Sequence, residues 1–369
     1  MGTESARPLH IIIDGGNTDV KGMVLGRYGH EIVFPHYVDT PTDAVYENAI
    51  NEYVTGLRRY RATDTVMFRS GDQAFVVGQR AAKVGKGRNM RGASKYTREQ
   101  MGALVKAALY KLVPAGHPNV HLTVLHPADI TAHNLRSLIK SVAGKHRMIM
   151  PDKGKVEYNV TKVFTDIEPV AGFQTFLLNT DGGTYVRGQM NVHPGMRFLV
   201  CDVGGALTSF VPVYITDSGE VDIDTYGVPV IRSGITNVYD TLKIELKSTI
   251  PQLGNVQHID EYILGEAVST DVVTLKNRPV ECAEQVERAM QTVADPIRAM
   301  YQDRYSEGNG YNGVIVTGGG GGVAYNYLRD RVFEHDFCFM AEEELGRMRF
   351  SNIRGSSKGM ANFLASMRI

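Results

Sequence analysis

The chain has 369 residues, a length typical of two domains rather than one. Lysine plus arginine and aspartate plus glutamate balance at 40 each, so bulk charge gives no reason to expect a polyanion ligand. The cysteines Cys201, Cys282 and Cys338 form no pair motif, which excludes a disulfide framework or a cysteine zinc site and indicates reduced, cytoplasmic usage. No apolar run approaches the ~18 residues of a membrane span, and residues 1–8 do not read as a signal peptide, so we expect a cytoplasmic protein without membrane binding.

The first third of the chain predicts strands and then a helix. Residues 9–13 and 22–25 read as a hairpin whose tip is Asp14 to Lys21, and residues 31–78 alternate short strands with turns around an apolar-periodic stretch near 45–57. Thr97 then caps a predicted helix that Pro114 ends. One face of that helix is apolar at helical spacing, through Met101, Leu104, Val105, Ala108, Leu109 and Leu112.

The remaining elements alternate strand and helix. We predict strands at 120–125, 160–164, 198–201, 209–215 and 314–316. We predict helices at about 134–142, 236–247, 259–267, 280–301, 324–328 and 358–367. This alternation indicates an α/β sheet core in each half of the chain.

Three glycine-rich turns follow short apolar runs. They are Asp14-Gly-Gly-Asn-Thr-Asp-Val-Lys21, Asp202-Val-Gly-Gly-Ala-Leu-Thr-Ser209 and Thr317-Gly-Gly-Gly-Gly-Gly322. A strand that ends in such a turn exposes backbone N–H groups that phosphate oxygens can approach without a Cβ in the way. Either Asp-x-Gly alone could be a simple turn-former. Together, in this order, they suggest a duplicated fold that binds a nucleotide from both halves.

The order and spacing of these turns resemble the actin, sugar-kinase and heat-shock-chaperone ATPase superfamily. The first two turns look like its two phosphate loops, residues 314–322 look like its adenosine motif, and residues 166–172 resemble the segment that connects its halves. Smaller features are similar to prokaryotic actins of the plasmid-segregation (ParM-like) and archaeal type. These features are Phe75 to Ala81, Lys95 to Gly102, and Ser351-Asn-Ile-Arg-Gly355.

The resemblance implies an α/β fold of two duplicated, actin-like (ribonuclease H-like) domains flanking a nucleotide cleft. Domain I is expected at 1–170 plus 350–369, with an insertion subdomain at about 31–95. Domain II is expected at 171–349, with an insertion at about 241–300.

Several residues are candidates for binding and hydrolysing ATP, with GTP as the alternative. Asp14 and Asp202 are the natural carboxylates for Mg²⁺, held through water, and Lys21 is placed to meet a β-phosphate oxygen. By resemblance, Glu168 positions or activates the attacking water, and we expect an extended backbone there because Pro169 follows. The remaining nucleotide-binding candidates are Gly15, Gly16, Asn17, Thr18, Gly204, Gly205, Gly318, Gly319, Gly320 and Gly321; Asn17, Thr18 and Asp19 could instead cap the turn.

The second turn departs from the superfamily pattern. Leu207 stands where a threonine is expected, and Ser209 where an aspartate is expected. Thr208 is the candidate that would supply the hydroxyl from a shifted place. A scaffold that binds nucleotide but hydrolyses it poorly therefore stays open.

Residues 80–98 carry seven basic side chains and no acidic one. A solvated loop, a contact with a neighbouring subunit and DNA binding are the alternatives, in that order, and we do not expect direct nucleic-acid binding. His117 and His121 are not read as a metal site, because Pro118 interrupts a helix.

The resemblance implies a nucleotide-dependent, filament-forming ATPase of the prokaryotic cytoskeleton, which acts in DNA or plasmid segregation or cargo positioning. Its partners would be itself, as a head-to-tail polymer, and an adaptor protein that links the filament to DNA. The alternative is a small-molecule kinase of the same superfamily, although no catalytic aspartate stands out near 160–171. A chaperone-like ATPase is disfavoured, because it would need a long peptide-binding domain.

Overall fold

The computed structural model describes residues 8–56, 65–83, 98–114, 117–151, 153–180, 192–223, 228–254, 259, 261–275, 278–305, 310–334, 336–342 and 345–367. The described residues form two compact units. Unit 1 contains residues 8–168, Thr180 and 356–367, and unit 2 contains 169–179 and 192–355. Two of the points at which the chain passes between the units, Glu168/Pro169 and Gly355/Ser356, lie near the domain boundaries that the sequence suggested, 170/171 and 349/350.

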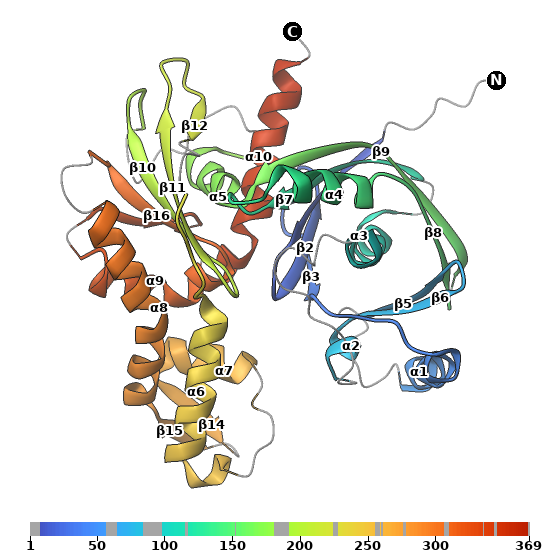
Figure 1. The fold of residues 1–369 in the computed structure, drawn as a ribbon, viewed down its shortest axis with the longest axis horizontal. Helices are drawn as coiled ribbons and strands as arrows, with labels where there is room; N and C mark the ends of the chain where they lie inside the picture. Colours follow the sequence, from blue (N-terminus) through green and yellow to red (C-terminus); the bar gives the residue numbers. More distant parts are fainter. Residues whose placement is uncertain are drawn as a thin grey trace. The chain divides into compact units, whose positions relative to one another are not determined.

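Unit 1 is built on a nine-stranded sheet in the order β3-β2-β1-β7-β9-β8-β5-β6-β4 (Figure 1). Its central strands β1, β7 and β9 are parallel, and β2 returns antiparallel to β1. The strands are β1 (Leu9–Gly15), β2 (Asp19–Val24), β3 (Ile32–Pro35), β4 (Val38–Asp39), β5 (Thr65–Ser70), β6 (Gln73–Gly78), β7 (Asn119–His126), β8 (Gly144–Met150) and β9 (Gly154–Ile167).

The helices of unit 1 are α1 (Asp43–Gly56), α2 (Gln79–Lys83), α3 (Arg98–Leu112) and α4 (Ala132–Val142). The apolar face that the sequence predicts for α3 is buried at all six positions and packs into the main core of the unit. Its predicted cap, Thr97, lies outside the described residues. Helix α4 begins after Thr131, whose side chain accepts a hydrogen bond from the Asn134 amide.

Unit 2 has a sheet in the order β12-β11-β10-β16-β17, with β13 paired to β11. Strands β10 and β11 form an antiparallel hairpin, and β10, β16 and β17 are parallel. The strands are β10 (Arg197–Val203), β11 (Thr208–Ile215), β12 (Val221–Ile223), β13 (Val230–Ile231), β16 (Gly313–Thr317) and β17 (Cys338–Met340), and β14 (Val272–Leu275) and β15 (Arg278–Glu281) form a separate hairpin.

The helices of unit 2 include three that begin at other residues than predicted. Helix α8 begins at Ala283, because residues 278–281 form β15, and α9 begins inside the glycine run. Helix α10 begins at Ser351 and continues into unit 1. The helices are α5 (Glu168–Leu177), α6 (Ile235–Thr249), α7 (Glu261–Thr270), α8 (Ala283–Arg304), α9 (Gly319–Arg331) and α10 (Ser351–Ser366), with 3-10 turns η2 (Pro251–Leu253) and η3 (Leu345–Phe350).

The two units repeat one pattern of strands, as the sequence predicts. In unit 1, β3, β2 and β1 pair antiparallel in turn, and β7 and then β9 follow β1 as parallel strands. Unit 2 repeats this order as β12-β11-β10-β16-β17. The hairpins correspond down to their register: Asp14 lies opposite Lys21, and Asp202 lies opposite Ser209. In the described part of the chain, no helix combines the length and apolar character needed to cross a membrane.

Candidate functional site

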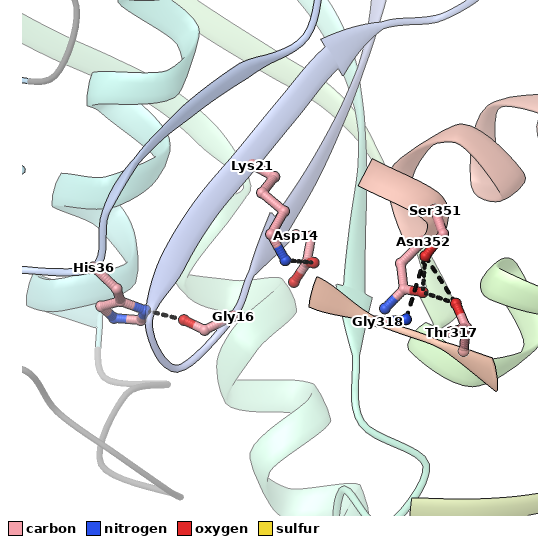
Figure 2. Close-up of polar contacts among 8 residues, drawn as sticks. All are labelled: Asp14, Gly16, Lys21, His36, Thr317, Gly318, Ser351 and Asn352. Carbon is pink, nitrogen blue, oxygen red and sulfur yellow. Dashed lines mark hydrogen bonds and ion pairs between the residues drawn. The ribbon is translucent and has the colours of Figure 1, made fainter. Parts of the chain in front are cut away.

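The first glycine turn places two opposite charges side by side. Strand β1 ends at Gly15 and β2 begins at Asp19, so that Asp14 and Lys21 lie opposite each other across the hairpin. Lys21 Nζ is 3.3 Å from Asp14 Oδ2, and the two side chains are 12% and 3% exposed (Figure 2). This pair is therefore held away from bulk water.

Electrostatics connect the pair to Glu168. Burial, the largest single influence, lowers the pKa of Lys21, but the charges of Asp14, Asp19 and Glu168 and the hydrogen bond to Asp14 outweigh it, so the pKa lies above its usual value. Lys21 is therefore a buried ammonium at neutral pH. One charged cluster in unit 1 therefore contains Asp14, Lys21 and Glu168. Asp14 and Glu168 are 154 residues apart in the sequence.

The cluster suits a phosphate with a bound magnesium ion. Asp14 Oδ1 is buried and accepts no hydrogen bond from any residue of the described chain. Gly16 lies beside this oxygen. A Cβ added to Gly16 would stand 2.8 Å from the Asp19 carbonyl oxygen and 3.9 Å from Lys21 Nζ. A side chain would fill this space, so the glycine keeps it open beside a carboxylate and an ammonium. The residues present therefore fit the expected group.

The first turn is tied to a histidine that the sequence analysis did not select. His36 is completely buried between β3 and β4, and its ring nitrogen Nδ1 bonds the carbonyl oxygen of Gly16 (Figure 2). Its backbone N–H also donates to the Thr18 carbonyl oxygen at 2.8 Å. A single histidine after a short strand carries no motif, so no sequence signal pointed to it.

The second turn closes on itself and on a helix. Asp202 is 7% exposed near the end of β10, and the Gly204 N–H donates to the Leu207 carbonyl at 2.8 Å. The first two N–H groups of α6 donate back to the turn, Ile235 to Gly204 O at 3.1 Å and Thr236 to Gly205 O at 2.9 Å. The turn therefore supplies the acceptors that a helix N-terminus lacks.

Thr208 does not replace the missing threonine of the second turn. It is fully buried, and its hydroxyl donates to the Ser233 carbonyl oxygen at 2.8 Å. The hydroxyl is therefore used inside unit 2, because β11 already begins at Thr208 and turns that side chain inward. Leu207 offers only a half-buried hydrocarbon at the preceding position.

The third glycine run is the start of a helix, whereas the sequence predicted a turn there and a helix only from about residue 324. Gly318 has φ +85° and precedes α9, and Gly319 to Gly322 form the first turn of that helix. A Cβ on Gly320 would lie 2.8 Å from the Gly204 carbonyl oxygen, and a Cβ on Gly318 would overlap Asp202 Oδ1. The glycines therefore let α9 approach the second turn at backbone distance. This close approach explains why residues of low helix propensity begin a helix here.

A buried polar network fixes the same glycines. The Gly318 N–H donates to Ser351 Oγ at 3.3 Å, and Ser351 Oγ lies 2.8 Å from Thr317 Oγ1 (Figure 2). Thr317 also donates to Asn352 Oδ1 at 3.1 Å. The Gly318 amide is therefore hydrogen-bonded within unit 2. Ser351 and Asn352 belong to a segment that the sequence singled out only for its resemblance.

Comparisons with known proteins agree with this arrangement. Residues 13–170 match the family model described as the N-terminal domain of actin-like proteins. Solved structures also match over nearly the whole chain. An archaeal actin homologue aligns at TM-score 0.72 and 16% identity, covering 96% of this chain and 99% of that one. The chain has the actin-like fold.

Two ParM structures also align with this chain over nearly its whole length. A 15-stranded ParM filament from Clostridium botulinum aligns at TM-score 0.68 and 17% identity, covering 96% of this chain and 99% of that one. Bacillus thuringiensis ParM with ATP aligns at TM-score 0.66 and 15% identity, covering 98% and 99%. Comparison with curated protein sequences gives no match. The expected resemblance to ParM-like and archaeal actins is confirmed at the level of the fold.

The candidate residues thus fall into two groups in this actin-like chain. Asp14 to Lys21 and Glu168 lie together in unit 1, and Asp202, Gly204, Gly205 and Gly318 to Gly321 lie together in unit 2. Glu168 is the first residue of α5 instead of part of an extended segment. Pro169 is tolerated there because the first turn of a helix needs no N–H donor at that position. The basic stretch from 84 to 97, and the start of the Lys95 to Gly102 motif, lie outside the described residues.

Proposed function

We propose that this chain is an actin-like ATPase that assembles into filaments when it binds nucleotide. The observation that supports this most directly is the buried Lys21 beside Asp14 at a turn kept open by Gly16. A largely buried ammonium is costly unless an opposite charge compensates it, and the β- and γ-phosphates of ATP carry the opposite charge. Among the structural neighbours are a ParM with ATP and an archaeal actin homologue with ADP.

Each candidate residue has a defined task in this proposal. Bound Mg²⁺ would neutralise phosphate charge, with Asp14 and Asp202 as its carboxylates through water. Lys21 holds a phosphate oxygen by charge and hydrogen bonding. Glu168, whose charge already acts on Lys21, orients the attacking water and accepts its proton. The glycines of unit 2 bring backbone against the rest of the nucleotide.

Assembly is the second part of the proposal. A head-to-tail contact between copies of one chain does not close on itself, so it generates an open filament. One structural neighbour is a 15-stranded ParM filament. By analogy, we propose that the filament moves or spaces DNA or other cargo, and that an adaptor protein connects it to DNA.

Sedimentation tests both parts. With ATP and magnesium the protein should pellet and show fibres by negative-stain microscopy, and without nucleotide it should stay in the supernatant. GTP, ADP and a non-hydrolysable ATP analogue run in parallel would establish nucleotide preference. A protein that binds ATP but stays monomeric at high concentration would contradict assembly and favour a kinase of the same fold.

A weakly hydrolysing scaffold is the second candidate, and one observation favours it. The Thr208 hydroxyl donates a hydrogen bond to the Ser233 carbonyl oxygen, and Leu207 has no hydroxyl. The second turn therefore lacks the side-chain hydroxyl that its pattern predicts. Fibres that form with ATP and persist without phosphate release would favour this candidate. Fibres that disappear as phosphate is released would favour the ATPase.

A further inference from the structure

His36 makes two hydrogen bonds to the first glycine turn. Its ring Nδ1 bonds the Gly16 carbonyl oxygen, and its backbone N–H donates to the Thr18 carbonyl oxygen at 2.8 Å. Because a carbonyl oxygen only accepts hydrogen bonds, ring nitrogen Nδ1 carries the proton. The side chain is 0% exposed, so water does not compete for this bond.

These bonds fix which way the turn presents its backbone. In a planar trans peptide, the C=O of one residue and the N–H of the next point in opposite directions. When His36 holds the Gly16 carbonyl, the Asn17 N–H of the same peptide points away from His36. In the same way, the bond to the Thr18 carbonyl turns the Asp19 N–H away.

Orientation matters because a phosphate needs donors and is repelled by carbonyl oxygens. Gly15 and Gly16 have no Cβ to restrict their dihedral angles, so the turn itself does little to prevent a peptide from rotating. A rotated Gly16–Asn17 peptide would exchange its N–H for a carbonyl. Lys21 and Asp14 would then still be present, but the backbone beside them would carry the wrong partial charge.

We propose that His36 is a positioning residue for the phosphates of the nucleotide, which keeps the Gly16–Asn17 peptide turned with its N–H available to them. The proposal rests on the proposed nucleotide binding. It adds a requirement for a donor at the place of Nδ1, which a merely space-filling side chain would not meet.

Three substitutions separate these roles. His36→Asn keeps an amide donor near the position of Nδ1, His36→Gln moves the donor outward to the position of Nε2, and His36→Leu removes it. The matched control is His146→Leu. His146 is a buried histidine on β8 of the same unit, whose ring nitrogen Nε2 lies 2.7 Å from the Val142 carbonyl oxygen.

The measurement is the affinity of each full-length variant for ATP, ADP and adenosine by calorimetry, with the melting temperature recorded without ligand. We expect His36→Leu and His36→Gln to weaken ATP and ADP binding about tenfold, the effect of losing about 1.4 kcal/mol, with adenosine affinity unchanged. His36→Asn should recover affinity to within about threefold of the parent. His146→Leu should lower the melting temperature and leave all three affinities alone.

The outcomes also distinguish this inference from the function on which it depends. If the parent binds ATP and His36→Gln binds it equally well, the inference is wrong and the proposed function stands. If the variants lose affinity for adenosine and ATP equally, His36 only stabilises the fold. The same conclusion follows if His36→Asn does not recover affinity for ATP. If His36→Leu does not fold, the comparison of Asn with Gln decides. A parent that binds none of the three ligands would overturn both proposals.

Discussion

The Gly355 backbone in α10 packs directly against the Ala171 carbonyl in α5. A Cβ on Gly355 would overlap that oxygen and lie 2.6 Å from Thr175 Oγ1. Thr175 donates to the Ser351 carbonyl at 2.5 Å, one turn earlier in α10. The two helices therefore approach to backbone distance at Gly355, beside the buried hydroxyl of Thr175. Because Ser351 also bonds the Gly318 amide, this contact supports the start of α9.

Gly355→Ala should therefore destabilise the protein strongly. The obstacle is backbone, which cannot rotate aside as a side chain can, so we expect a loss of about 3 kcal/mol in the free energy of unfolding. Urea unfolding followed by circular dichroism measures it. The control is Gly346→Ala, since a Cβ there meets nothing within 4 Å. Equal stability of the two variants would show that the helices separate easily at this point.

The Asp14–Lys21 pair predicts strong coupling between two substitutions. Asp14→Asn leaves the Lys21 ammonium buried without its nearest counter-charge, which we expect to cost about 3 kcal/mol of stability. Adding Lys21→Met removes that stranded charge, so the double variant should be more stable than Asp14→Asn alone. A double-mutant cycle from urea unfolding gives the coupling energy.

The same variants test the site. If the pair serves phosphate and magnesium, all of them should lose phosphate release, including the double variant that regains stability. A double variant that hydrolyses ATP at the parent rate would remove both residues from the proposed site. Strictly additive stabilities would show instead that Lys21 reaches solvent in the isolated protein.

How far the sequence predicts this molecule depends on the kind of signal. The first hairpin was predicted, but its strands run further than expected, so that Asp14 and Lys21 face each other within the strands instead of forming the tip. The buried face of α3 followed from a period of 3.6 residues. The start of α9 could not be predicted, because it depends on contact with the second turn more than 110 residues away, between Gly204 and Gly320, against the propensity of glycine. His36 was missed for a related reason: its role comes entirely from a tertiary bond to Gly16.

His10 predicts a loss of stability in acid. It is buried on β1, where Nε2 lies 2.7 Å from Thr123 Oγ1, and its ring stacks on Phe164. Burial and then the charge of His121 lower the pKa of His10 to about 4. Along the same row of the sheet stand His121 and Lys162, and burial and Lys162 also lower the pKa of His121. Among the described residues, His121 is the charged group that lowers the pKa of His10, and no carboxylate opposes it.

The sign follows from comparing folded and unfolded chains. A histidine in the unfolded chain takes up a proton near pH 6.5, whereas folded His10 stays neutral until the pH falls to about 4. The stability present above pH 6.5 is therefore lost as the pH falls from 6.5 through about 4. The loss should reach about 3 kcal/mol. His10→Gln keeps an amide near Thr123 but does not titrate, so it should lose less stability between pH 7.5 and 4.5. Equal losses in urea unfolding would contradict the assignment.

Glu168 should affect hydrolysis far more than binding. It stands at the first residue of α5, half-buried, and its charge acts on Lys21. If it orients the attacking water, Glu168→Gln should slow phosphate release about 100-fold, while ATP affinity changes less than about threefold. The reason is that the amide keeps the shape but cannot accept the water proton. Filaments of the variant should then persist longer after ATP addition, as measured by light scattering.

Glu157→Gln is the control for Glu168. Glu157 lies on β9, the strand that leads to Glu168, and forms an ion pair at 2.5 Å with Arg147, whose side chain is 63% exposed. Because that pair is open to solvent, its removal should leave phosphate release and filament lifetime unchanged. A Glu168→Gln variant that loses ATP binding would make Glu168 a structural partner of Lys21 instead. A variant that releases phosphate at the parent rate would transfer the water-positioning role to another residue.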